Sequence, residues 1–225
     1  DGVADSYEQA AVYLDSFLQE QDNAPGATQA RRHTYLTEAP RMVDYLISKG
    51  IKLTRVSAWP DYYDDRPGGS VPGRTVVAEL FNVNELGPWK SKLRPGFLTL
   101  PAMLEEALEL PKFRTSWKAR GLMLKVAGRA IAAVLTGKRW VSAGHALQGR
   151  MLQAALRVGV EIRTESPVRE LIVENGAVKG VLTVRDGKPW RIAARLGVLV
   201  NVGGFAHNQR MRDQYQPGTS SSWSS

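Results

Sequence analysis

The sequence LVNVGGFAHN, residues 199–208, runs an apolar stretch directly into two consecutive glycines, Gly203 and Gly204. The apolar residues from Leu196 to Val202 predict a strand. Glycine adopts backbone conformations that are closed to other residues, and it lets a large group approach the main chain closely. A strand that ends in this way suits a nucleotide cofactor, but a tight turn would need no more than the same two glycines. The elements that precede the strand therefore decide between the two interpretations.

A helix and a series of strands lead up to this stretch. GHALQGRMLQAALR, residues 144–157, has the apolar spacing of a helix, and Gly159 follows as a stop signal. Strands are expected at 160–163, 168–174, 177–184, 190–194 and 196–202. The dipeptides Asn175-Gly176 and Asp186-Gly187 are typical of hairpin turns. The pattern predicts a strand and helix module with an antiparallel meander.

The first half of the chain predicts helices and one long irregular segment. Ser6 and Gln9 have the spacing of a capping box before a helix that includes Tyr7 to Leu18. After a break at DNAPG, residues 22–26, helices are expected over 30–36, from Pro40 to Gly50, over 102–109 and over 112–136, with a strand at 51–56. Residues 57–100 are rich in proline, glycine and aromatic residues, which indicates an ordered excursion.

Composition excludes several kinds of site. The chain has no cysteine, and its three histidines, His33, His145 and His207, lack the spacing of metal ligands, so no metal site is expected. No apolar run reaches the roughly 18 residues of a membrane-spanning helix. The net charge is +8, and residues 111–160 contain lysine and arginine but no acidic residue. This basic region is interpreted first as a solvated face, with a membrane surface or a nucleic acid as alternative partners.

The order of the elements also matches a known family. GHALQGRML, VEIRTESPV, LIVENGAVKGV, GVLVNVGGF and HNQRMRDQY follow one another along the chain. This order resembles the FAD-dependent 3-ketosteroid dehydrogenases, within the fumarate reductase and succinate dehydrogenase flavoprotein superfamily. WPDYYDDRPGG, with PGRT after it and WS near the end, narrows the resemblance to the ketosteroid branch. The resemblance covers nearly all 225 residues but only the middle of such an enzyme.

The resemblance implies an α/β fold, the central part of a glutathione-reductase-like FAD-binding domain with an inserted helical region and a β-meander. The N-terminal fingerprint and the capping domain of the family are absent. RPGGSVPG does not replace the fingerprint, because it follows no clear strand and opens no clear helix, so its glycines are expected to shape a loop. The implied divisions are a helical and loop insertion at 1–140, a strand–helix and meander part at 141–217, and a truncated connection at 218–225.

The resemblance also implies a cofactor and its contacts. FAD would lie with its adenosine end at the backbone of Val168 and would pass close to Asn201, Val202, Gly203 and Gly204. Tyr62, the first tyrosine of PDYY, matches the residue that assists a second, basic tyrosine in removing a ring proton. A phenol, with an ordinary pKa near roughly 10, can relay a proton or stabilise a phenolate through a hydrogen bond.

The function implied is dehydrogenation of ring A of a 3-ketosteroid, with hydride transfer to FAD; residues 1–225 alone are expected to be inactive. One alternative is a fumarate-reductase-like enzyme acting on a small unsaturated acid, and another is a non-catalytic interaction module. The expected partner is a steroid-like small molecule and not a nucleic acid, with peripheral membrane contact through 112–140 as an option. The absence of cysteine fits a cytoplasmic location, with membrane association as a further option.

Overall fold

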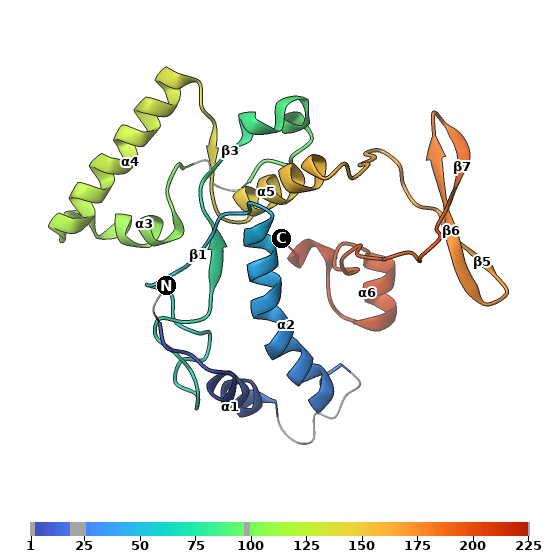
Figure 1. The fold of residues 1–225 in the computed structure, drawn as a ribbon, viewed down its shortest axis with the longest axis horizontal. Helices are drawn as coiled ribbons and strands as arrows, with labels where there is room; N and C mark the ends of the chain where they lie inside the picture. Colours follow the sequence, from blue (N-terminus) through green and yellow to red (C-terminus); the bar gives the residue numbers. More distant parts are fainter. Residues whose placement is uncertain (1–2, 19–25, 97–99, 225) are drawn as a thin grey trace. The chain divides into compact units, whose positions relative to one another are not determined.

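The computed structural model describes residues 3–18, 26–96 and 100–224, and divides the chain into two compact units, residues 1–161 and residues 162–225. The predicted break at DNAPG lies largely outside the described residues. Each unit combines helices with small sheets, and all the strand pairs in the described residues are antiparallel. The first unit carries most of the helices, and the second carries the meander (Figure 1).

Two helices open the first unit and pack against each other. Helix α1, Tyr7–Phe17, begins where the Ser6 hydroxyl accepts the Gln9 N–H, as the capping pattern predicts. Helix α2 is a single element, Gln29–Ser48, that contains Pro40. The prediction of two separate helices here is wrong. Leu36 to Glu38 carry no glycine or other stop signal, so the helix continues through the one proline and ends before Gly50.

Two small sheets and a bent helical segment follow. Strand β1, Leu53–Arg55, pairs with β2, Val76–Ala78, and β3, Phe81–Asn82, pairs with β4, Trp140–Val141. The 3-10 segment η1 covers Val83–Ser91. Helix α3, Leu104–Glu109, runs into η2, Leu110–Arg114, and α4 covers Trp117–Thr136 with Ser116 as its cap. The single helix predicted over 112–136 is therefore divided, because the Ser116 hydroxyl accepts the Ala119 N–H and starts a new helix.

The core of the first unit forms around Phe81, which is 1% exposed. Helix α5, Ala143–Arg157, confirms the predicted helix and packs against β2 and β3. Gly149 brings this helix close to the core, because a Cβ atom there would lie 2.6 Å from the Phe81 ring. The buried Arg150 stacks its guanidinium on the same ring and donates to the carbonyl groups of Glu79 and Leu80. The charge is thus held by backbone acceptors beside an aromatic face.

The second unit confirms the predicted meander. Strands β5, Glu170–Glu174, β6, Ala177–Arg185, and β7, Lys188–Ala193, form one twisted ribbon in the order β5-β6-β7 (Figure 1). Both residues of each turn, Asn175-Gly176 and Asp186-Gly187, have positive φ, which matches the twist of a two-residue hairpin. Helix α6, Gln209–Tyr215, capped by Asn208, and η3, Ser221–Trp223, complete the unit.

Two predicted strands are not formed. Residues 160–163 and 196–202 do not form strands. Leu196, Leu199 and Val202 are 105%, 91% and 83% exposed. An apolar pattern predicts an extended backbone, but a strand also needs a neighbour that supplies ladder hydrogen bonds. No other described segment pairs with 196–202. The strand prediction is wrong because an apolar pattern indicates which side chains favour burial, but does not indicate whether a neighbouring strand is present to pair with.

Candidate functional site

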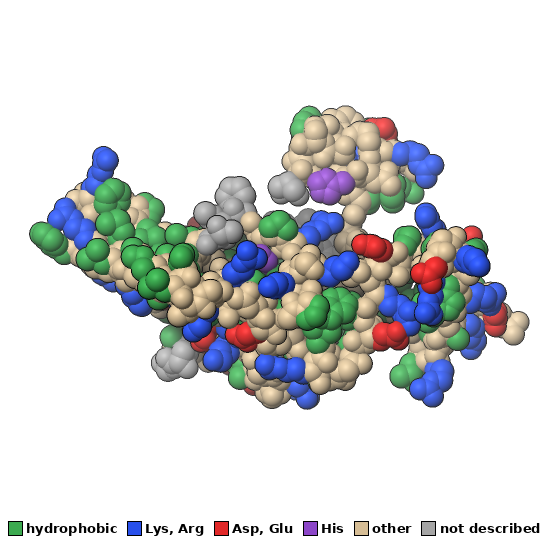
Figure 2. Space-filling view, turned by 90° about the horizontal axis from the view of Figure 1, so that it is seen from above, with side chains coloured by type: hydrophobic (Ala, Val, Ile, Leu, Met, Phe, Trp, Pro, Cys, Tyr) green, Lys and Arg blue, Asp and Glu red, His purple; other side chains and the backbone are tan. Residues whose placement is uncertain are grey.

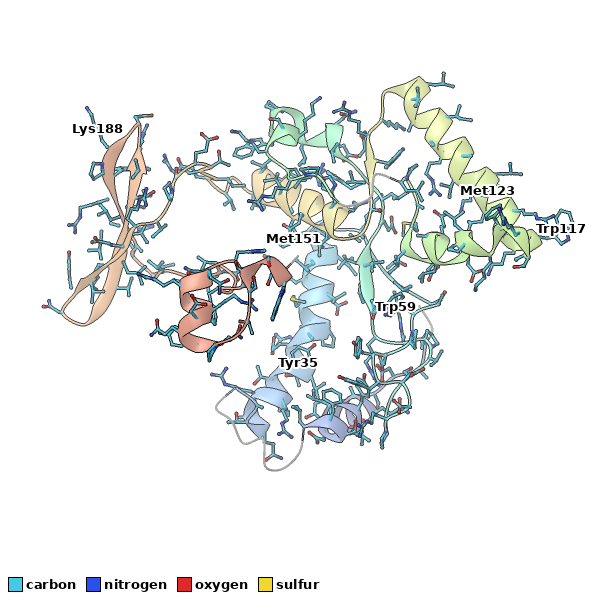
Figure 3. The ribbon with its side chains drawn as sticks, turned by 180° about the vertical axis from the view of Figure 1, so that it is seen from behind. Tyr35, Trp59, Trp117, Met123, Met151 and Lys188 are labelled. Atoms are coloured by element: carbon cyan, nitrogen blue, oxygen red, sulfur yellow. The ribbon has the colours of Figure 1, made fainter. Side chains whose placement is uncertain are left out.

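The loop at residues 56–75 joins β1 to β2 and carries the PDYY motif. Figure 3 labels Trp59 near its start, beside the end of β1. Backbone hydrogen bonds cross the loop from Asp61 N–H to the Ser70 carbonyl at 3.1 Å and from Gly73 N–H to the Trp59 carbonyl at 2.8 Å. A Cβ atom at Gly73 would lie 2.3 Å from the Asp61 nitrogen. The glycine therefore permits a close backbone crossing, so it shapes a loop as the sequence predicts.

Asp61 is the buried polar centre of this loop, with its side chain 6% exposed. One carboxylate oxygen accepts the Arg74 N–H at 2.7 Å. The other oxygen accepts the Ser70 N–H at 3.1 Å and a proton of the Arg74 guanidinium. A buried carboxylate is tolerated when its oxygens are paired in this way. Asp61 thus connects the start of the loop to Ser70 and Arg74 on its opposite side.

Arg74 extends this network to the start of the chain. Its Nε and Nη2 atoms donate to the two carboxylate oxygens of Asp5 at 2.8 and 2.9 Å. These hydrogen bonds lower the pKa of Asp5 below its usual value and raise the pKa of Arg74, with the charge of the partner acting in the same direction. The Arg74 guanidinium also lies over the Tyr13 ring, 5.4 Å from the centroid. One arginine thus links the loop to Asp5 and to α1.

Helix α1 contacts the other side of the PDYY motif. The half-buried Tyr13 accepts the Tyr63 N–H at its hydroxyl oxygen, at 3.0 Å. Phe17 lies between the rings of Tyr13 and Tyr63, with centroid distances of 5.2 and 5.6 Å. The Tyr63 ring meets the edge of the Tyr62 ring at 4.9 Å. Gly68 has a positive φ and rests against the backbone of α1 at Gln9 and Tyr13.

Tyr62 is 86% exposed, although its ring contacts that of Tyr63. Its neighbours in the chain, Asp61 and Tyr63, are both held through backbone hydrogen bonds. A large aromatic side chain is thus presented to solvent from a backbone that is fixed on both sides. Such an arrangement can place a phenol against a small molecule or against another part of the protein without reordering the loop.

The residues predicted to contact FAD belong to the second unit. Val168 precedes β5 and is 59% exposed. Residues 201–204 have no regular secondary structure, and Val202 is 83% exposed. Tyr62 is not among them, since it lies in the first unit.

Residues 201–204 have open space around the two glycines. Gly203 has a φ of 74°, and a Cβ atom at Gly203 or Gly204 would meet no described atom within 4 Å. The backbone groups of Asn201 to Gly204 make no hydrogen bond to any residue the structure describes. Their hydrogen-bonding groups therefore have no partner among the described residues.

Sequence reasoning missed the residues that hold Tyr62. Asp61, Tyr13 and Asp5 were not selected, because nothing in a local pattern connects residue 5 or 13 to residue 61 or 74. Arg74 lies in the PGRT motif that supports the family resemblance, and this was the one available signal. His145, outside this network, accepts the Gly96 N–H at its Nδ1 atom.

Helix α4 lies within the basic region and carries four of its ten lysine and arginine residues. Its Trp117, Leu124, Val134 and Leu135 side chains are 70–82% exposed. Hydrophobic and basic side chains lie next to each other on the arm at the left of Figure 2, where α4 lies by its place in Figure 1. Figure 3 shows Trp117 projecting from the end of the helix.

Across the described ranges, every helix falls short of the length and hydrophobicity that membrane crossing requires. Within those ranges no group of three metal-ligating side chains occurs either.

The chain is similar to known flavoproteins over nearly its whole length. A family model described as an FAD binding domain matches residues 1–223. The 3-oxosteroid 1-dehydrogenase of Mycobacterium tuberculosis is 32% identical over 226 residues, which is 96% of this chain and 39% of that protein. The 4-oxocyclohex-2-ene-1-carboxylate 5-dehydrogenase of Sinomonas cyclohexanicum is 26% identical over 96% of this chain and 37% of that protein.

A solved structure matches the fold. The crystal structure of 3-ketosteroid delta1-dehydrogenase from Sterolibacterium denitrificans in complex with 1,4-androstadiene-3,17-dione superposes with a TM-score of 0.85 and 28% identity. The match covers 99% of this chain and 42% of that chain. The present chain therefore spans about two-fifths of the length of the relatives it matches.

Proposed function

This chain belongs to the FAD-binding domain family, and on that premise we propose that the protein containing it is an FAD-dependent dehydrogenase that desaturates ring A of a 3-ketosteroid. The similarity to 3-oxosteroid 1-dehydrogenases over 96% of the chain supports the reaction class. The single observation that carries the mechanism is Tyr62, exposed on a loop that is fixed on both sides. Because the chain spans 39% of such a relative, the activity belongs to the whole protein.

The reaction removes one proton and one hydride from neighbouring carbon atoms and leaves a carbon–carbon double bond. The proton adjacent to the ketone is the acidic one, and its removal needs a base near the ring. Tyr62 would donate a hydrogen bond to a second, basic tyrosine, which the family resemblance places outside these residues, and would stabilise its phenolate. FAD, when bound, accepts the hydride.

The second unit would supply part of the FAD site. The backbone at Val168 would contact the adenosine end, and Asn201 to Gly204 would pass close to the cofactor. The exposed main chain and the open space at the two glycines support this assignment. In the same proposal the helices and loops of residues 1–140 form an insertion in a glutathione-reductase-like domain, residues 141–217 form its strand–helix and meander part, and residues 218–225 lead toward a capping domain.

Residues 112–140 would form a peripheral membrane contact of a protein located in the cytoplasm. The exposed apolar side chains of α4 and the absence of acidic residues from this segment support an anionic lipid surface as the partner. Arg120 lies over the exposed Trp117 ring at 4.4 Å, which keeps a positive charge beside the apolar tip of the helix. A sterol-like substrate would be available at such a surface.

The test is anaerobic mixing of the full-length protein with a 4-ene-3-ketosteroid, followed by flavin absorbance and by mass analysis of the steroid. Bleaching of the flavin together with a loss of two hydrogens is the expected result. One parallel sample contains 4-oxocyclohex-2-ene-1-carboxylate, the small ring ketone in the name of the Sinomonas cyclohexanicum relative. Another contains fumarate with pre-reduced protein. Reduction by the small ketone alone would reassign the substrate, and reoxidation by fumarate alone would reassign the reaction.

Tyr62 is tested in the same assay. Tyr62→Phe removes the hydroxyl and keeps the ring, so flavin reduction should slow by about 100-fold while FAD stays bound. The matched control is Tyr35→Phe, which alters another exposed tyrosine of the first unit, on α2, and should leave the rate unchanged. An unchanged rate in Tyr62→Phe would remove this residue from the mechanism.

A further inference from the structure

We propose that Asp61 and Tyr13 are positioning residues that fix the direction of the Tyr62 phenol, with Arg74 as the link between them. The inference rests on the proposed role of Tyr62 and adds the groups that make the role possible. All four residues lie in the first unit. The phenol itself is 86% exposed, so the residues on either side of Tyr62 hold its backbone.

Asp61 fixes the backbone immediately before Tyr62. Its buried carboxylate accepts two backbone N–H groups, those of Ser70 and Arg74, and one guanidinium proton. Its own N–H donates to the Ser70 carbonyl. The carboxylate therefore has three charge-assisted hydrogen bonds that a neutral amide of the same size cannot all reproduce, because an amide NH2 cannot accept.

Tyr13 fixes the backbone immediately after Tyr62. Its hydroxyl oxygen accepts the Tyr63 N–H, although the two residues are 50 positions apart. Arg74 lies over the face of the Tyr13 ring while donating to Asp61 on one side and Asp5 on the other. The two anchors of the Tyr62 backbone are thus coupled through one guanidinium.

This coupling has a consequence for the reaction. A proton relay requires the phenol within hydrogen-bond distance of its partner, and a displacement of about 1 Å can reduce a rate by up to about 100-fold. Tyr62 has no described hydrogen bond of its own that would restore its direction if an anchor were lost. Loosening position 61 or 63 should therefore slow the chemical step with little effect on steroid binding.

The experiment is a double-mutant cycle in the full-length holoenzyme, measured as the rate of flavin reduction at saturating 4-ene-3-ketosteroid. Asp61→Asn should lower this rate about tenfold and leave the steroid concentration for half-maximal rate within about twofold. In the Tyr62→Phe background, Asp61→Asn should change the rate less than twofold, because an anchor has no effect once the group it positions is gone. Multiplicative losses in the double variant would overturn the proposal.

Tyr13→Phe is the second variant, because it removes one neutral hydrogen bond and keeps the aromatic packing even if Asp61→Asn does not fold. It should lower the same rate about threefold to tenfold, and again have no effect beside Tyr62→Phe. Its matched control is Tyr7→Phe on the same helix, where the ring contacts His33 on α2. Equal losses in the two phenylalanine variants would count against a positioning role.

Hydrogen exchange separates this inference from the proposed function. In Tyr13→Phe the amide of Tyr63 should exchange at least tenfold faster than in the wild type, whatever the substrate proves to be. A wild-type protein that no steroid reduces would refute the proposed function, while faster exchange at Tyr63 would still support the anchor. Unchanged exchange at Tyr63 in an active enzyme would refute the anchor and leave the proposed function in place.

Discussion

Glu106 is expected to control the attachment of α3 to α4. Its side chain is about 10% exposed, and it accepts two hydrogen bonds from the Arg129 guanidinium at 2.6 and 3.0 Å. Its carboxylate also accepts the Met103 N–H and pairs with Lys125 at 3.0 Å. These partners, above all Arg129, lower the pKa of Glu106 from 4.5 to about 2 against the opposing effect of burial. The carboxylate is therefore stabilised in the folded helix pair.

The size of the effect follows from that pKa. A lowering of the pKa by about 2.5, at about 1.4 kcal/mol for each tenfold change, corresponds to about 3.5 kcal/mol at neutral pH. Glu106→Gln removes the charge and leaves Arg129 without its ionic partner, so the helix pair should open about 100-fold more often. Hydrogen exchange of the α3 amides in the full-length protein measures this opening directly.

The pH dependence has a definite sign. Because the folded pKa is lower than the unfolded one, the stabilisation is complete above about pH 4.5 and is lost as the pH falls toward 2. The wild type and Glu106→Gln should therefore converge in acid. Glu109→Gln, which alters an outer carboxylate on the same helix paired with Lys112, is the control and should change α3 exchange little. Less than a fivefold effect of Glu106→Gln at pH 7 would refute the reasoning.

Three further outcomes are expected. Gly149→Ala should destabilise the protein by about 1–3 kcal/mol in chemical denaturation, because its Cβ would lie 2.6 Å from the Phe81 ring, whereas Gly128→Ala, which meets nothing within 4 Å on α4, should stabilise by up to about 1 kcal/mol. Residues 1–225 alone should bind FAD at least 100-fold more weakly than the full-length protein in a fluorescence titration, because they contain no G-x-G-x-x-G fingerprint; equal affinity would contradict this. Leu124→Asp on the exposed face of α4 should lower sedimentation of the full-length protein with vesicles of anionic lipid by at least threefold, and unchanged sedimentation would exclude this face as the contact.

Local signals predicted the elements whose stabilising contacts are themselves local. The helix over Ala143–Arg157 and the two hairpins were predicted from apolar spacing and from the Asn-Gly and Asp-Gly turns, and each formed as expected. Pro40 does not start a new helix, because a proline indicates a boundary only when the residues before it also favour one. The apolar residues at 196–202 predict a strand, but strand pairing depends on a neighbouring segment that a local pattern does not identify.

Unlike the helices and hairpins, the candidate site depends on residues that are far apart in the sequence. Tyr62 was found through a motif, while the groups that hold it are distributed over residues 5, 13, 61 and 74. The network nevertheless explains features of the motif that composition alone leaves arbitrary. Asp61, before the tyrosine pair, accepts hydrogen bonds from the opposite side of the loop. Gly73 of PGRT lets the two sides of the loop approach closely. Arg74 of PGRT supplies the positive charge that burial of Asp61 requires. If Tyr62 acts as proposed, the residues around it are constrained as strongly as the tyrosine itself, because each of them limits the directions that its side chain can take.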